Sequence, residues 1–155
     1  MSKAISRKLR SENNIGIISA RMKQKRYWSG AHTKHRMLYH IVWIPKYRKR
    51  VLVGEIATRV KELLRECAAV NRWHIDELNI QRDHVHMLVR LRPDVSVSKA
   101  VQLFKGRSSY EIRKAFPELK EFAWGTTKSF WGDGFFVETV GQVSEARIKE
   151  YIRNQ

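Results

Sequence analysis

The stretch DHVHMLVRLR, residues 83–92, decides the predicted fold because its side chains alternate between apolar and polar from Val85 onward, except at Leu88. Such alternation predicts a β-strand with one face in the core. Residues two apart share a face of a strand, so the apolar side chains would face the core. His84 and His86 would then point together to an exposed sheet face.

Two imidazoles that converge on one face make half of a metal site. Arg90 and Arg92 follow in the same phase as the histidines, and paired guanidinium groups suggest a phosphate-bearing ligand. The sequence argues against a structural zinc site, because such a site needs four ligands, usually thiolates, and Cys67 is the only cysteine. A chance pair of surface histidines remains an alternative on this pattern alone.

The last residues of the chain predict a short helix that begins after Ser144, a good N-cap, with Val143 and Ile148 placed to form a hydrophobic staple. Tyr151 and Gln155 are four residues apart and would project from one face of that helix. A hydroxyl nucleophile and an amide ligand would then reach a metal together. The spacing alone favours a plainer interpretation, with a partly buried tyrosine and a glutamine in solvent.

Composition limits the class of protein. The chain has 155 residues, with 31 Lys and Arg against 15 Asp and Glu, which gives a net charge of +16. This excess favours nucleic acid or another anionic partner.

We expect residues 1–35 to form a basic arm and residues 36–155 to form one domain. No signal peptide or membrane-spanning stretch is visible and cysteine is nearly absent, so we expect a cytoplasmic location.

The predicted elements alternate in the order β-α-β-β-α-β and end in a helix. Their expected ranges are a strand at 37–44, a helix at 55–71, a strand at 73–81 with a bulge at Asp76 and Glu77, the histidine strand, a helix capped by Ser96 and closed by Pro117, a strand at 135–140 and the C-terminal helix.

This order predicts a ferredoxin-like α+β fold with an antiparallel sheet, helices on one face and an open second face. The histidine strand is third, hence central, and would place its site in the middle of the open face. His40, on the first strand, would lie beside it. A core histidine bonded to its neighbours is the favoured interpretation of His40, and a contact with the site is the alternative.

Five motifs, in order and at matching spacing, resemble the single-tyrosine HUH transposases of the smallest bacterial and archaeal insertion sequences (the TnpA type). They are YHIVWIPKYR at 39–48, DHVHMLV at 83–89, QLFKG at 102–106, FVETVG at 136–141 and YIRNQ at 151–155. The resemblance implies that His84, His86 and Gln155 bind Mg²⁺ or Mn²⁺ and that Tyr151 is the nucleophile on the C-terminal helix.

The resemblance also implies the reaction and the partners. Tyr151 would attack a phosphate of single-stranded DNA near a hairpin, form a 5′-phosphotyrosine and release a 3′-hydroxyl. The covalent bond conserves the phosphodiester energy, so no nucleotide cofactor is needed, and no Gly-rich phosphate loop is present. A homodimer is implied, with the tyrosine acting in cis or in trans. Our candidates for DNA contacts are Arg90, Arg92, Lys105, Lys46 and Arg48.

Three other functions remain open at this point. A domesticated relative that cuts palindromic chromosomal repeats would share every motif. A replication-initiator nuclease or relaxase is a second alternative, although permuted relaxases place the tyrosine before the histidines. A non-enzymatic RNA-binding module would use the same open sheet, but it needs exposed aromatic residues on the central strands.

Overall fold

The computed structural model describes residues 28–29, 34–120 and 129–155. The chain divides into two compact units, Met1–Arg36 and Met37–Gln155. The second unit contains every candidate site residue named above.

In the first unit, β1 (Trp28–Ser29) and β2 (Lys34–His35) pair in antiparallel fashion. Most of the predicted basic arm, residues 1–35, lies outside the described residues. The arm and its boundary with a domain at 36–155 therefore stay predictions.

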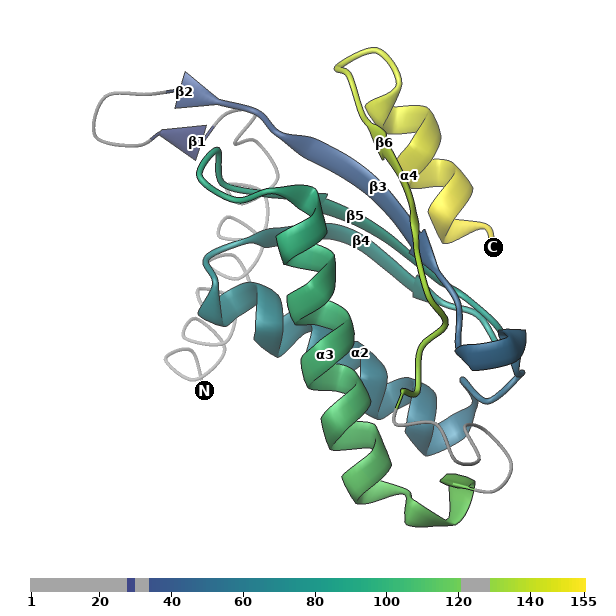
Figure 1. The fold of residues 1–155 in the computed structure, drawn as a ribbon. Helices are drawn as coiled ribbons and strands as arrows, with labels where there is room; N and C mark the ends of the chain where they lie inside the picture. The colour runs from purple at the N-terminus through teal and green to yellow at the C-terminus, as the bar shows by residue number, and fades with distance from the viewer. Residues whose placement is uncertain (1–27, 30–33, 121–128) are drawn as a thin grey trace, which may run out of the picture. The chain divides into compact units, whose positions relative to one another are not determined.

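The second unit has the predicted element order, β-α-β-β-α-β followed by a helix (Figure 1). Its strands form one antiparallel sheet in the order β4-β5-β3-β6, so β3 and β5 are the central pair, as expected of the first and third strands. The fold is the predicted ferredoxin-like α+β arrangement with one added helix. The elements are β3 (Leu38–Trp43), α2 (Gly54–Val70), β4 (His74–Ile80), β5 (Val85–Arg90), α3 (Val97–Ala115), β6 (Phe136–Thr139) and α4 (Glu145–Arg153), with short 3₁₀ turns η1 (Lys46–Arg48) and η2 (Pro117–Leu119).

Helices α2 and α3 cover one face of this sheet (Figure 1). Their buried side chains recur at helical spacing, so each helix turns an apolar stripe to the strands. Phe104 of α3 lies between two tryptophans, with ring centroids 6.4 Å from Trp43 and 5.3 Å from Trp73. The backbone N–H of Lys99 donates to the Ser96 hydroxyl, which confirms the predicted cap of α3.

The second sheet face is less open than the alternation predicted. All six residues of β5 are buried, because α4 packs over the side that carries the histidine. Leu88, the one exception to the alternation, forms an apolar cluster there with Leu38, Val140 and Ile152 of α4. Leu88, which interrupts the alternation, is therefore the residue of β5 against which the helix that carries Tyr151 packs.

The start of α4 differs from the prediction. Ser144 has helical dihedral angles, and its hydroxyl donates to the Gly141 carbonyl instead of capping the helix. The predicted hydrophobic staple between Val143 and Ile148 is wrong, since Val143 is 99% exposed and Ile148 packs against the apolar cluster on the sheet. The apolar surface of the sheet competes for Ile148 more effectively than one loop valine.

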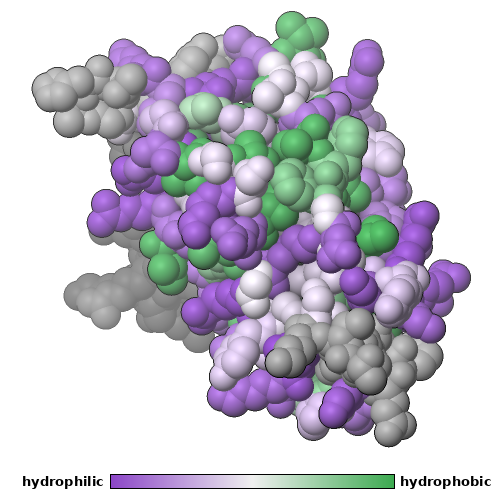
Figure 2. Space-filling view, viewed as in Figure 1, coloured by the Kyte–Doolittle hydropathy of each residue, from purple (hydrophilic) through white to green (hydrophobic). Residues whose placement is uncertain are grey.

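Hydrophobic residues gather on the surface over β6 in Figure 2, where Phe135, Phe136 and Val137 are exposed. β6 is an edge strand, paired on one side with β3. Within the described residues, every helix is too short or too polar to cross a lipid bilayer.

Candidate active site

The structure brings the two predicted histidines together. His84 lies just before β5 and His86 is its second residue, and their ring centroids are 4.8 Å apart in an edge-to-face arrangement. His86 pairs with Val42 of β3 on one side and with Asn79 of β4 on the other. It is only 5% exposed, so this part of the sheet face is covered and not open.

The first histidine is oriented by a carboxylate. His84 Nδ1 lies 2.7 Å from Asp83 Oδ1. A carboxylate only accepts, so Nδ1 carries a proton, and the tautomer with this proton has its lone pair on Nε2. The hydrogen bond from His84, aided by Arg48, lowers the pKa of Asp83, which keeps the acceptor ionised. His84 therefore presents a ligand nitrogen.

The second histidine is oriented by a longer chain of hydrogen bonds. His40 Nδ1 lies 2.9 Å from Glu138 Oε1, and His40 Nε2 lies 3.1 Å from His86 Nδ1. The tautomers that satisfy this chain put one proton on His40 Nδ1, donated to Glu138, and one on His86 Nδ1, donated to His40 Nε2. The lone pair of His86 is thereby left on Nε2, as on His84.

Both interpretations of His40 are confirmed, because it is a buried histidine bonded to its neighbours and it also contacts the site. Glu138 was missed by the sequence reasoning. The signal for it was present, since Glu138 is the one charged residue in the FVETV run of β6 and pairs with His40 in the sheet.

Burial lowers the pKa of His86 to about 4, and the neighbouring His84 and His40 add to the shift. His86 is therefore neutral at neutral pH. Neutral imidazole is the form that binds metal ions.

The tyrosine helix reaches the same place. The Tyr151 ring is half exposed, and its centroid lies 5.6 Å from that of His86 and 6.4 Å from that of His40. Asn79, the neighbour of His86 on β4, donates to the carbonyl of Ile152 at 2.8 Å. This bond satisfies a carbonyl of the last turn of α4, for which the helix itself offers no donor. Asn79 is a further residue that the sequence reasoning missed.

Gln155 lies beyond the end of α4 and is exposed. Among the described contacts, none joins it to either histidine. Its role as third metal ligand stays a prediction.

The residues present fit a divalent cation. The Nε2 atoms of His84 and His86 have no hydrogen-bond partner among the described residues. No group of three or more His, Cys, Asp or Glu side chains forms a metal site in the part of the chain that the structure describes. Two imidazole ligands leave coordination positions for an amide oxygen and for phosphate oxygens.

Two of the predicted DNA contacts stand on η1, and one of them, Arg48, lies near the site. The Arg48 guanidinium bonds Asp83 Oδ2 at 3.1 Å and is two-thirds exposed. Lys46 lies 3.4 Å from Asp133. Both stand on η1, where Tyr47 and Arg48 have left-handed dihedral angles.

The other three candidates also have intramolecular partners. Arg90 is 8% exposed and bonds Asp76, in the bulge predicted on β4, at 2.9 and 2.7 Å. Arg92 bonds Asp94 at the surface. The Lys105 ammonium donates to carbonyl oxygens of the 132–134 segment at 2.6 and 3.0 Å. Their predicted DNA contacts stay predictions, and Arg90 has a structural role.

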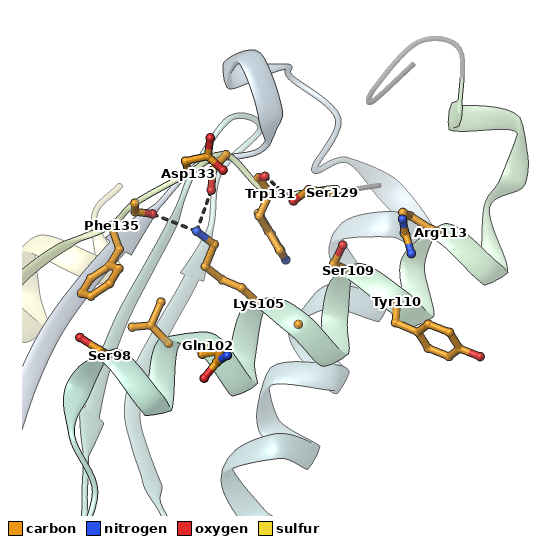
Figure 3. Close-up of a pocket in the computed structure, with 14 residues that line it drawn as sticks. Ser98, Gln102, Lys105, Ser109, Tyr110, Arg113, Ser129, Trp131, Asp133 and Phe135 are labelled. Carbon is orange, nitrogen blue, oxygen red and sulfur yellow. Dashed lines mark hydrogen bonds between the residues drawn. The ribbon is translucent and has the colours of Figure 1, made fainter. Parts of the chain in front are cut away.

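Lys105 lines a separate cavity of about 490 Å³ between α3 and residues 129–135 (Figure 3). Burial lowers the pKa of its ammonium group. Figure 3 shows Lys105 bridging from α3 to the opposite wall, where Trp131 and Asp133 lie. This lysine holds the cavity walls together, and the cavity is distinct from the histidine site.

A family model described as "Transposase IS200 like" matches residues 33–155. The chain is similar to the ISDra2 transposase TnpA of Deinococcus radiodurans, with 36% identity over 121 residues, 78% of this chain and 85% of the relative. It is also similar to the transposase for insertion sequence element IS200 of Salmonella typhimurium, with 38% identity over 125 residues, 81% of this chain and 80% of the relative.

Solved structures share the fold. A crystal structure assigned as a transposase from Deinococcus radiodurans matches with a TM-score of 0.67 and 34% identity, covering 83% of this chain and 97% of that one. A REP-associated tyrosine transposase bound to a REP hairpin matches with a TM-score of 0.56 and 13% identity, covering 81% of this chain and 68% of that one. The second likeness is one of fold alone.

Proposed function

Because the chain belongs to the IS200-like transposase family, we propose that it cleaves and rejoins single-stranded DNA at insertion-sequence ends through a 5′-phosphotyrosine on Tyr151. The observation that carries this proposal is the position of the Tyr151 ring, 5.6 Å from the ring of His86. A tyrosine hydroxyl and two histidine side chains meet at one place. We place this reaction in the cytoplasm, because the DNA substrate is there.

In the first step the Tyr151 hydroxyl oxygen bonds to phosphorus, the bond from phosphorus to the 3′ oxygen breaks, and the 3′ end leaves as a hydroxyl. His84 and His86 would hold Mg²⁺ or Mn²⁺ through Nε2, with Gln155 as an added ligand. The bound ion supplies charge stabilisation at the phosphate oxygens. Asp83, His40 and Glu138 keep the two imidazoles in the tautomer that exposes those nitrogens.

In the second step a 3′-hydroxyl from another DNA end attacks the phosphotyrosine and releases Tyr151. The number of phosphodiester bonds is unchanged, so the cycle needs no nucleotide cofactor. Both named relatives are insertion-sequence transposases, which favours a mobile-element enzyme over a domesticated one.

A DNA hairpin and a second copy of the chain are the proposed partners. The fold is shared with a tyrosine transposase bound to a REP hairpin, which supports the hairpin. The exposed apolar residues Phe136 and Val137 on the edge strand β6 support a homodimer, because an unprotected edge readily pairs with another strand.

The test is adduct formation on single-stranded DNA hairpins with Mn²⁺, read as a protein–DNA band in denaturing gels and mapped by peptide mass. We expect an adduct on Tyr151 in the wild type and none in Tyr151→Phe, which removes one oxygen and little packing. Tyr110→Phe, which changes another exposed tyrosine, is the matched control. An adduct on another residue, or equal cleavage of duplex DNA, would overturn the proposal.

A further inference from the structure

Helix α4 is weakly attached by apolar contacts. Of its nine residues only Ile152 is buried, and Ile148 is partly buried beside it. The segment that joins it to β6 is exposed at Gly141 and Val143. One buried isoleucine is little to order a helix of this length, because short helices are marginal without packing. Other contacts must hold it.

Those contacts are a cluster of four charges. Asp76 and Arg90 stand on the sheet and are 5% and 8% exposed, and Arg90 forms a bidentate pair with Asp76. Arg90 Nη2 also donates to Glu145 of α4 at 3.0 Å. Lys149, one turn further along α4, lies 3.1 Å from Asp76 Oδ2 and 2.7 Å from Glu145 Oε1. Each sheet charge therefore has one partner on the helix.

The ion pairs of this cluster allow α4 to undock from the sheet. Asp76 and Arg90 form an ion pair with each other on the sheet, so undocking of α4 would not leave a lone buried charge there. Glu145 and Lys149 would stay paired with each other one turn apart in solvent. The far end of α4 is also held by polar groups, through Asn79 and an ion pair between Arg153 and Glu77.

We propose that Asp76 and Arg90 form a docking site for α4, engaged by Glu145 and Lys149, and that this docking positions Tyr151 beside His86. Glu145 and Lys149 are positioning residues, since they touch no reacting atom. The inference rests on the proposed function for the role of Tyr151, whereas the docking itself is independent of any reaction.

The test compares two double variants of the full chain with equal net charge. Glu145→Gln/Lys149→Met removes both helix charges of the cluster. The control, Arg147→Met/Glu150→Gln, makes the same kinds of change at exposed positions of α4. Hydrogen exchange of the α4 amides reports docking, and the amides of β5 report the integrity of the sheet.

We expect the cluster variant to exchange its α4 amides about tenfold faster while β5 is unchanged, because local opening is measured separately from global unfolding. At saturating hairpin DNA, adduct formation should slow by a similar factor with the DNA concentration for half-saturation unchanged. The control should match the wild type in both. Glu145→Gln alone should give a smaller shift in the same direction.

Unchanged α4 exchange in the cluster variant would overturn the docking site. Faster exchange with an unchanged adduct rate would overturn the positioning of Tyr151. If the wild type forms no adduct, the proposed function fails with the positioning role, and exchange alone still decides whether the cluster docks the helix.

Discussion

The histidines stand on or beside a central strand whose six residues are all buried, whereas Tyr151 stands on a nine-residue helix with one buried side chain. The strand has neighbours on both sides and layers on both faces. In the part of the chain that the structure describes, the helix contacts the sheet largely through ions and hydrogen bonds. The histidine half of the site is thus part of the core, and the proposed nucleophile is carried on a separate element.

This difference predicts that the two halves respond differently to mutation. Changes around β5 should affect both stability and metal binding, whereas changes on α4 should affect delivery of the nucleophile and little else. The same contrast applies within the histidine pair, because His86 is buried and His84 is partly exposed.

The largest effects are expected at the histidines. His84→Ala and His86→Ala should each abolish metal-dependent cleavage. His86→Ala should also reduce the free energy of unfolding by about 1–3 kcal/mol, because it leaves His40 without its buried partner. His84→Ala should change it by less than about 0.5 kcal/mol, as is usual near a surface. Urea unfolding checks both values, and equal stability losses would contradict the contrast.

A smaller effect is expected at Glu138. In Glu138→Gln the amide can donate to His40 Nδ1 and favour the wrong tautomer along the chain to His86. Mn²⁺ affinity should fall about 10–100-fold, the usual range for residues that orient metal ligands. Electron paramagnetic resonance of free Mn²⁺ measures it, with Glu118→Gln on η2 as control. Unchanged affinity would show that His86 needs no such orientation.

Next in size is Ile152→Ala, which removes the one buried side chain of α4. We expect adduct formation to slow by about tenfold through local undocking, while the melting transition stays close to wild type. Leu63→Ala in the α2 core is the comparison, and it should lose about 2–5 kcal/mol of stability. A loss of similar size in Ile152→Ala would mean that α4 unfolds with the core.

The smallest effect is expected at Gln155. A neutral amide is a weak ligand, and water can replace it on Mg²⁺ or Mn²⁺. Gln155→Ala should therefore slow cleavage by less than about tenfold, measured at saturating metal. A loss equal to that of His84→Ala would make this residue a principal ligand.

Much of the fold was predictable because periodicity reports which face each side chain takes. It predicted the element order, the central position of the histidine strand and the bulge at Asp76. Periodicity does not report what covers a face, so the burial of His86 and Arg90 beneath α4 was missed. The roles of Arg90 and Glu138 depend on contacts with partners 14 and 98 residues away, which no local pattern reveals.

The most direct test of the separation between the two halves is Mn²⁺ binding to Tyr151→Phe, measured by electron paramagnetic resonance beside the wild type and His84→Ala. We expect an affinity within about twofold of wild type for Tyr151→Phe, because this change keeps the ring and removes no proposed metal ligand, and a much larger loss for His84→Ala. A loss of Mn²⁺ binding in Tyr151→Phe as large as in His84→Ala would contradict it.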